Sequence, residues 1–308
     1  MPTRHRLLAA VVAVCWGLNF LAIDASLQLF PPFFLVALRF ALLAVPTVLL
    51  VPFPQVPLRW LVGYGLGFGT FQFLFLYWGM AAGMPVGLSS LVLQASAPFT
   101  VVLAGVLLRH PLTPRAAVGV AVAVAGLAVV GWQRLDGPAA FWPFVLVLAG
   151  AFAWAVGNLC SAQARAPEPL HLMLWMSVVP VLPMLALSLA VEGPHRIAAS
   201  LTAWDAPDAP AALAGLAYTV LVGTVVGSGI WTWLLARHPA GTVAPFSMLV
   251  PVVGMSAAWL VLGEGISAGE GAGAVLVVAG VLVATRPARR PVPAVRPSGP
   301  RPRAARAA

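Results

Sequence analysis

The sequence predicts an all-α integral membrane protein with ten transmembrane helices, arranged as two inverted five-helix repeats. Three observations lead to this prediction: a composition suited to hydrocarbon, ten apolar runs of membrane-spanning length, and a match between the two halves of the chain. Of the 308 residues, 61% are apolar and 8% are charged, whereas a soluble domain carries about 25% charged residues. A chain so poor in charge could not cover a surface exposed to water.

Ten apolar runs have the length of about 20 residues that a helix needs to cross the hydrocarbon core. These runs are apolar on every side, which favours helices over the alternating strands of a membrane barrel. Short connections containing Pro, Gly and Arg separate them, and the longest connection covers residues 192–210. The predicted spans are Leu7–Leu27, Pro32–Val51, Trp60–Ala82, Val86–Leu108, Pro114–Trp132, Phe141–Ser161, Leu170–Ala190, Ala211–Ala236, Thr242–Leu262 and Ala268–Thr285.

The positions of the Arg residues predict how the chain is oriented. If the amino terminus lies in the cytoplasm, only Arg134 and Arg196 fall outside, and Arg39 lies within a span. Cytoplasmic loops carry an excess of basic residues, so we expect both termini to be cytoplasmic. The chain has abundant Arg, Ala and Gly but no Lys. This bias suggests GC-rich coding and therefore the inner (plasma) membrane of a bacterium.

The two halves of the chain match one another in sequence. Residues 116–130 align with residues 270–284 without a gap. The Trp and Asn residues near the middle of spans one and six recur in the same order, as Trp16, Asn19, Trp154 and Asn158. Because each half holds an odd number of spans, the second half should enter the membrane upside down, as in many secondary transporters. We predict five-helix repeats over residues 7–132 and 141–285, and a disordered Arg/Pro-rich cytoplasmic tail over residues 286–308.

Several motifs resemble those of a known family. They are WGLNF (16–20), LRF (38–40), GMPVGLSSLVLQASAPF (83–99), AFAWAVGN (151–158) and LVPVVGMSAAWLVLGE (249–264). In their order and spacing they resemble the EamA family of the drug/metabolite transporter superfamily. The stretches GMPVGLSSLVLQA (83–95) and APFSMLVPVVG (244–254) are particularly similar to the bacterial exporters of O-acetylserine and cysteine. The resemblance implies ten helices, cytoplasmic termini and efflux of small metabolites, often amino acids. The chain departs from the family at His110, where an acidic residue is usual, and at Asp24, where a basic residue is common.

Arg39 is the most conspicuous candidate for a functional residue. It lies eight residues into the second span, about 12 Å deep at ~1.5 Å per residue. A charge at that depth costs at least ~2.5–3.5 kcal/mol, so the side chain should face a partner or a wet cavity. A fixed ion pair with Asp24, contact with a substrate carboxylate, and a gating role are the alternatives.

Polar and aromatic side chains near the membrane midplane are the other candidates. An amide there needs hydrogen-bond partners, and a zwitterionic amino acid offers both donors and acceptors. Cavity lining is therefore predicted for Trp16, Asn19, Gln72, Gln94, Trp154 and Asn158. Packing and hydrogen bonds between helices are the alternative. Asp24 and Glu264 are candidates for proton coupling or gating, with solvated or helix-capping roles as the alternative.

Together these observations predict a secondary transporter that exports small amino-acid-type metabolites, similar to cysteine or O-acetylserine, by alternating access. Efflux of another solute, such as an aromatic amino acid, a drug-like cation or a carboxylate, is the alternative within transport. A non-transporting scaffold or sensor is the alternative outside it. The sequence contains no HExxH or GxSxG motif, so we expect no enzyme activity, and no cofactor or metal. The sequence has no basic stripe with interleaved aromatic residues, so we expect no nucleic-acid binding. The expected partners are the lipid bilayer and a small-molecule substrate, and the oligomeric state stays open.

Overall fold

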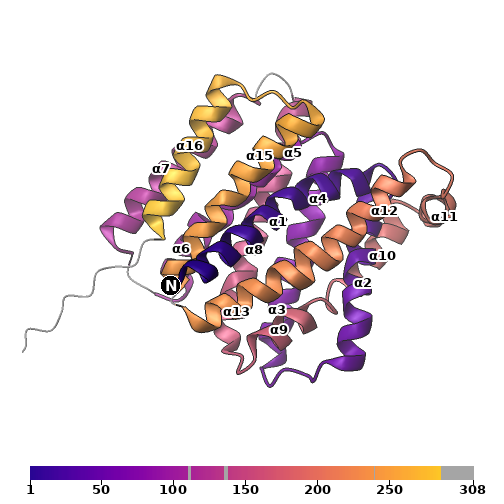
Figure 1. Ribbon diagram of the computed structural model, residues 1–308, viewed down its shortest axis with the longest axis horizontal. Coiled ribbons are helices and arrows are strands. Elements are labelled where there is room, and N and C mark those ends of the chain that lie inside the picture. Colours follow the sequence, from indigo (N-terminus) through magenta and orange to yellow (C-terminus); the bar gives the residue numbers. More distant parts are fainter. Residues whose placement is uncertain (110–111, 135–137, 239, 286–308) are drawn as a thin grey trace, which may run out of the picture.

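The computed structural model describes residues 1–109, 112–134, 138–238 and 240–285. Within these ranges the chain is helical and contains no strand (Figure 1), which confirms the predicted all-α class. The predicted disordered tail over residues 286–308 and the departure at His110 lie outside the described residues.

The helices of the first half follow the predicted spans closely. Two of them begin with a Pro, Pro32 and Pro114, at the first helical position, where a missing N–H and a fixed φ suit a helix start. The Thr113 hydroxyl also caps α7 (Pro114–Trp132) by accepting a hydrogen bond from the Ala116 N–H at 3.2 Å. The helices are α1 (Thr3–Leu27), α2 (Pro32–Leu50), α3 (Leu58–Tyr64) with η1 (Gly65–Gln72) and α4 (Phe73–Ala81), α5 (Val86–Val92) with η2 (Leu93–Ala95) and α6 (Ser96–Leu107), and α7 (Pro114–Trp132).

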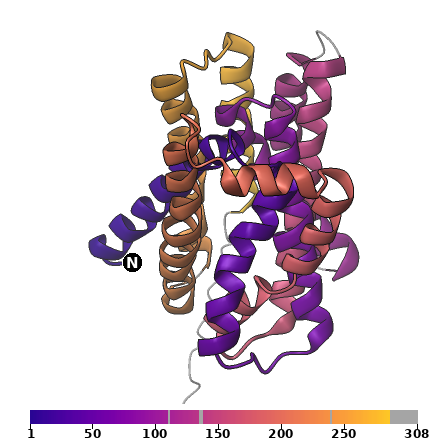
Figure 2. The ribbon, with the colours of Figure 1, turned by 90° about the vertical axis from the view of Figure 1, so that its right-hand side faces the viewer.

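The second half follows the same order with one addition. The long connection over residues 192–210 contains a short surface helix, α11 (Pro194–Thr202), at the end of the molecule opposite the amino terminus (Figures 1 and 2). The helices are α8 (Pro138–Ala164), α9 (Pro169–Met176) with α10 (Val181–Val191), α11 (Pro194–Thr202), α12 (Ala209–Ala217) with η3 (Tyr218–Ser228) and α13 (Gly229–Arg237), α14 (Ala240–Val243) with η4 (Ala244–Met248) and α15 (Leu249–Leu262), and α16 (Ala268–Ala284).

Eight helical segments of the described residues are long and apolar enough to cross a membrane. Two predicted spans are not among them. The first is the segment α3–η1–α4, and the second is α16, a shorter apolar helix of 17 residues. The chain is therefore a multi-pass membrane protein, and the count of ten spans stays a prediction.

The third and eighth predicted spans both contain π-helical turns, over η1 in the third and η3 in the eighth. Thr70 donates its hydroxyl hydrogen bond to the Gly65 carbonyl at 3.2 Å, and Thr224 does the same to the Thr219 carbonyl at 2.9 Å. These two pairs occupy equivalent positions in the two halves. Because π-helical turns are rare and often lie at functional sites, their repetition draws attention to the space between η1 and η3.

Each helix of one half packs against the counterparts of the helices that its own counterpart packs against in the other half. Helix α1 packs against α15 and the α12–η3 segment, and its counterpart α8 packs against α6 and the α3–η1–α4 segment. The pairs α2–α10 and α7–α16 each join a helix to its own counterpart, and Figure 1 shows α7 beside α16. This arrangement is that of two related units around a common axis.

Helices α7 and α16 show the relation most clearly, because the aligned stretches of sequence pack against each other. A Cβ added to Gly119 would lie 2.7 Å from the Gly280 carbonyl oxygen, and one added to Gly126 would lie 2.7 Å from the Gly273 carbonyl oxygen. Gly119 aligns with Gly273, and Gly126 with Gly280. The contact is therefore reciprocal, as across a two-fold axis. Since the residue numbers run in opposite directions, the two helices are antiparallel.

This close crossing predicts a large effect of a side chain at Gly280. A Cβ there would collide with the backbone nitrogen of Ala123, which cannot move aside. We expect Gly280→Val to destabilise the fold by about 1–3 kcal/mol, the range of overpacked cores. The matched control is Gly229→Val in α13, where an added Cβ meets nothing within 4 Å. Thermal unfolding of the two purified variants tests this expectation, and equal midpoints would contradict it.

Candidate functional site

A chamber of about 670 Å³ lies between the two halves. Its walls come from the helices of both repeats, including η1 and η3. Every residue that the sequence analysis nominated for substrate binding lines this chamber: Trp16, Asn19, Arg39, Gln72, Gln94, Trp154 and Asn158. The structure thus brings together side chains that are up to 142 positions apart in the chain (16 to 158).

One end of the chamber reaches the surface at which the amino terminus lies. Residues at or just beyond the carboxyl ends of three helices line this mouth: Arg165 after α8, Ala236 in α13 and Thr285 after α16. Arg165 is exposed. The Arg distribution predicts that this surface faces the cytoplasm.

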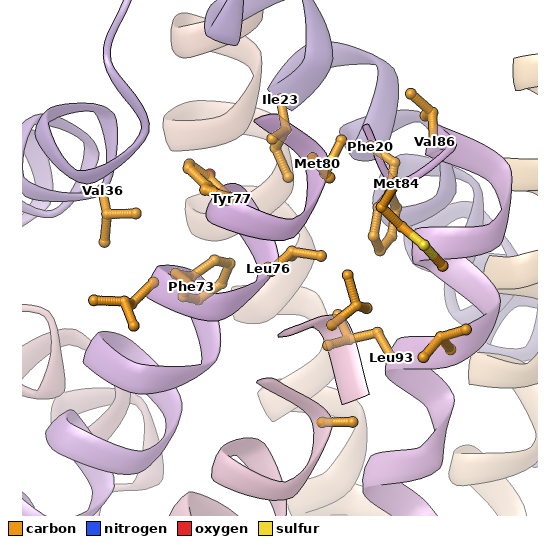
Figure 3. Packing of buried hydrophobic residues seen from close by; sticks show 14 of the residues in the cluster. Phe20, Ile23, Val36, Phe73, Leu76, Tyr77, Met80, Met84, Val86 and Leu93 are labelled. Carbon is orange, nitrogen blue, oxygen red and sulfur yellow. The ribbon is translucent and has the colours of Figure 1, made fainter. Parts of the chain in front are cut away.

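The other end of the chamber is closed by buried apolar side chains. Phe20 and Ile23 of α1 meet Leu76, Tyr77 and Met80 of α4, and Figure 3 shows these side chains close together. Ile23, Leu76 and Tyr77 are each 1% exposed. We call these five residues the outer plug.

Beyond the outer plug lies a second cavity of about 580 Å³. Asp24 and Met80 line it together with Arg196 and Ser200 of α11. Asp24 therefore belongs to this outer cavity and not to the chamber. The two cavities lie on opposite sides of the plug.

Arg39 is buried at the inner side of the plug, with 3% of its surface exposed. One guanidinium nitrogen, Nη1, donates to the Tyr77 hydroxyl at 2.7 Å, and Nη2 donates to Thr224 Oγ1 at 2.9 Å. The guanidinium carbon lies 4.1 Å from the centroid of the Phe73 ring, within range of a cation–π interaction. In the part of the chain that the structure describes, no carboxylate pairs with Arg39. The ion pair with Asp24 that the sequence suggested is therefore wrong.

Three buried polar atoms of the chamber lack hydrogen-bond partners among the described residues. They are one donor, Nε of Arg39, and two acceptors, Oδ1 of Asn19 and Oε1 of Gln72. Buried polar atoms are nearly always paired, so each exception needs an explanation. A ligand with both acceptor and donor groups would supply the missing partners.

The other nominated polar residues do make bonds between helices. The Asn158 amide donates to Thr100 Oγ1 at 3.2 Å, and the Gln94 amide donates to the Ser247 carbonyl at 3.3 Å. The Trp16 indole N–H donates to the Gly223 carbonyl at 2.9 Å. These residues line the chamber but have a structural role as well, as the alternative interpretation of the sequence expected.

Aromatic rings from both halves form the walls of the chamber. Trp16 of α1 packs on Trp231 of α13, with ring centroids 5.1 Å apart. Across the chamber, Trp154 of α8 packs edge-on against Phe68 of η1 at 5.8 Å, and Phe68 contacts Phe73 at 5.7 Å. The sequence analysis missed Phe68, Phe73 and Trp231, because nothing in an apolar run marks which ring faces inward.

Glu264 holds a helix start instead of facing the chamber. Its two carboxylate oxygens accept hydrogen bonds from the backbone N–H groups of Val86 at 2.7 Å and Gly87 at 2.9 Å, at the start of α5. This carboxylate favourably meets the positive end of the helix dipole. The sequence suggested either proton coupling or gating, or else a solvated or helix-capping role. The geometry is that of a helix cap, made between the two halves.

Glu192 makes the same contact at the start of α2, and the sequence analysis missed it. Its carboxylate accepts from the N–H groups of Phe33 at 2.7 Å and Phe34 at 2.9 Å, and from the Ser188 hydroxyl at 2.6 Å. Both caps join an acidic residue ending a second-half span to a Pro-led helix start in the first half. That repeated pattern could have revealed Glu192.

The sequence profile described as the EamA-like transporter family matches residues 4–132 and 141–286. A "probable amino-acid metabolite efflux pump" of Salmonella typhimurium is 41% identical over 288 residues, which cover 92% of this chain and 95% of the relative. A protein of the same description from Escherichia coli is 38% identical over the same shares of the two chains. A "probable terminal-alkyne amino-acid exporter" of Streptantibioticus cattleyicolor is 29% identical over 71% of this chain and 70% of its own length.

A solved crystal structure shares the fold. It superposes with a TM-score of 0.58 over 92% of this chain and 97% of its own, at 18% sequence identity. The likeness therefore extends over nearly the whole of both molecules.

Proposed function

Because the chain belongs to the EamA-like transporter family, we propose that it exports small amino-acid-type metabolites, similar to cysteine and O-acetylserine, through the chamber between its two halves. Two relatives, 41% and 38% identical, are described as probable amino-acid metabolite efflux pumps. The observation that carries the proposal is Arg39, a buried cation that faces the chamber with no carboxylate partner among the described residues.

The proposed architecture has ten transmembrane helices in two inverted repeats, over residues 7–132 and 141–285. Leu58–Ala81 and Ala268–Ala284 complete the ten. The reciprocal, antiparallel packing of α7 on α16 supports the inversion. Both termini and the tail over residues 286–308 lie in the cytoplasm, and the protein resides in the bacterial inner membrane.

In the proposed complex the substrate carboxylate pairs with Arg39, where a guanidinium can donate two parallel hydrogen bonds. The ammonium group donates to the two unpaired amide oxygens, those of Asn19 and Gln72. The side chain of the substrate lies against Trp16 and Trp154. Asn158 and Gln94 contact the substrate further along the chamber.

Transport proceeds by alternating access in this proposal. The chamber is open toward the cytoplasm, and the outer plug closes its other end. This is the state that receives substrate from the inside. Opening to the other side requires Phe20 and Ile23 to part from the α4 side chains. The caps made by Glu192 and Glu264 tie the halves together at that end, so they act as gating contacts. Asp24 then lies on the exit route, in the outer cavity.

Counterflow with purified protein in vesicles tests the proposed function. The panel contains cysteine, O-acetylserine, an aromatic amino acid and a drug-like cation. We expect flux of cysteine and O-acetylserine, because both offer a carboxylate to Arg39. Flux of the cation alone would overturn the proposal.

Aromatic amino acids are the second candidate substrates. The two aromatic walls, Trp16 with Trp231 and Trp154 with Phe68, would stack favourably on an aromatic side chain. Tryptophan or phenylalanine carried in preference to cysteine in the same panel would favour this alternative.

The unpaired amide oxygen of Gln72 leads to a separate prediction. Gln72→Leu removes one acceptor for the ammonium group, and a hydrogen bond to a charged group contributes about 1.5–3 kcal/mol. We expect the apparent KM for cysteine to rise at least about tenfold. Thermal stability should not fall, because the amide oxygen has no hydrogen-bond partner among the described residues. Gln133→Leu, outside the chamber, is the control. A lower unfolding midpoint with an unchanged KM would assign Gln72 to packing instead.

A further inference from the structure

We infer that the chamber also accepts amino-acid-derived carboxylates whose α-nitrogen carries no charge, such as N-acyl amino acids, and that it prefers them to the parent zwitterions. The inference rests on the proposed function, because it takes the chamber to be the transport route. It concerns which charge state of the substrate the chamber receives.

The charges that line the chamber are all positive. Among the lining residues that the structure describes, the charged ones are Arg39 and Arg165, and none is Asp or Glu. The acidic residues of the chain lie elsewhere or outside the described residues. They are Asp24 in the outer cavity, Glu168 at the cap of α9, Glu192 and Glu264 in their caps, Asp205 and Asp208 between α11 and α12, Glu270 beside Arg134, and Asp136, which is not described.

This charge balance favours a monoanion over a zwitterion. The carboxylate of either molecule neutralises Arg39, but the ammonium of the zwitterion then stays in the chamber with no counter-charge. An unpaired charge surrounded by low-dielectric walls is strongly unfavourable. Acylation of the nitrogen removes that charge and keeps one N–H, which still suits Asn19 Oδ1 or Gln72 Oε1.

The size and surface of the chamber also suit an acyl group. A volume of about 670 Å³ falls within the range of roughly 300–1,000 Å³ found for small-molecule pockets. Trp16, Trp154 and Trp231 present apolar ring faces against which a neutral acyl chain can pack.

The same charge pattern gives anion export a direction. Arg165 at the mouth attracts anions from the inner side. In a bacterial plasma membrane the interior is negative, so the potential drives an anion outward, whereas it does no work on a net-neutral zwitterion. Export of N-acyl amino acids should therefore be electrogenic, and that of cysteine electroneutral.

The full chain reconstituted in vesicles tests the inference with cysteine, N-acetylcysteine and cysteamine under reducing conditions. The three share a thiol and differ in carboxylate and amine charge. We expect an apparent KM for N-acetylcysteine at least about tenfold below that for cysteine. N-acetylcysteine flux should increase when a valinomycin-imposed potassium potential drives anions from the loaded side, and cysteine flux should not respond.

The outcomes separate the inference from the proposed function. Transport of cysteine without transport of N-acetylcysteine overturns the inference alone. If neither carboxylate is carried, or if only cysteamine is, the proposed function falls and the inference with it.

A charge-adding variant provides an independent test. Gln72→Glu keeps the shape of the side chain and adds a carboxylate to the chamber. We expect the preference to reverse, with the ratio of N-acetylcysteine to cysteine flux falling at least about tenfold. Gln133→Glu adds the same charge just after α7, outside the chamber, and should leave the ratio unchanged. An unchanged ratio in Gln72→Glu would overturn the inference.

Discussion

Replacing Arg39 with Gln is expected to reduce amino-acid transport by about a hundredfold or more. The substitution removes a buried cation at the closed end of the chamber, where the substrate carboxylate would be desolvated. Truncating one partner of a buried charge pair costs about 2–5 kcal/mol, and each 1.4 kcal/mol is about a factor of ten. Initial rates of cysteine uptake into vesicles, at equal amounts of reconstituted protein, measure the loss.

The same substitution should not weaken the fold, and this separates a binding role from a structural one. Arg39 donates hydrogen bonds to two hydroxyls but has no carboxylate partner among the described residues. The cost of holding a buried cation in a membrane offsets those two bonds. We expect Arg39→Gln to unfold at the same temperature as the parent protein or higher. Arg39→Lys keeps the charge but loses the planar fork, so it should retain part of the activity. Normal transport by a properly inserted Arg39→Gln protein would remove Arg39 from the mechanism.

Replacing Glu192 with Gln is expected to open the outer side of the protein and to lower its stability. Glu192 is 7% exposed, and its carboxylate accepts three hydrogen bonds, from the Phe33 and Phe34 N–H groups and the Ser188 hydroxyl. Gln offers one oxygen in place of two and turns an N–H₂ group toward donors. Each buried donor left unpaired costs about 1–3 kcal/mol, so the unfolding midpoint should fall by several degrees.

Access to the outer plug reports the opening. Ile23 is 1% exposed, so a cysteine placed there should react slowly with a membrane-impermeant thiol reagent added from outside. In a background with Cys15→Ala and Cys160→Ala, we expect Glu192→Gln to speed the labelling of Ile23→Cys. Glu168→Gln, at the other end of the molecule, is the control. Equal labelling rates in the two variants would show that the Glu192 cap does not hold the plug closed.

The predicted spans agree with the observed helices because a membrane dictates both length and composition. The predicted span Val86–Leu108 corresponds to the helical segment Val86–Leu107, and Pro114–Trp132 is identical to α7. The sequence analysis did not place α11, because its nine residues form a surface helix with no apolar run of spanning length. Only the packing of Ile197 and Ser200 reveals it as part of the fold.

The chamber was predictable in outline but not in its contacts. Depth within a span placed Arg39 near the midplane, and the repeat placed Trp16 opposite its counterpart Trp154. The ion pair with Asp24 failed because the outer plug separates the two residues. Arg39 instead meets Tyr77 and Thr224, a ring hydroxyl and a hydroxyl of a π-helical turn. Those partners come from other helices, and no local sequence pattern predicts them.

The central claim is that the chamber recognises its substrate through a carboxylate bound to Arg39. Calorimetric titration of the purified full chain with cysteine and with cysteamine tests it most directly, because the two ligands differ only in that carboxylate. The claim predicts saturable binding of cysteine and at least about a hundredfold weaker binding of cysteamine. Cysteamine binding as tight as that of cysteine would contradict it.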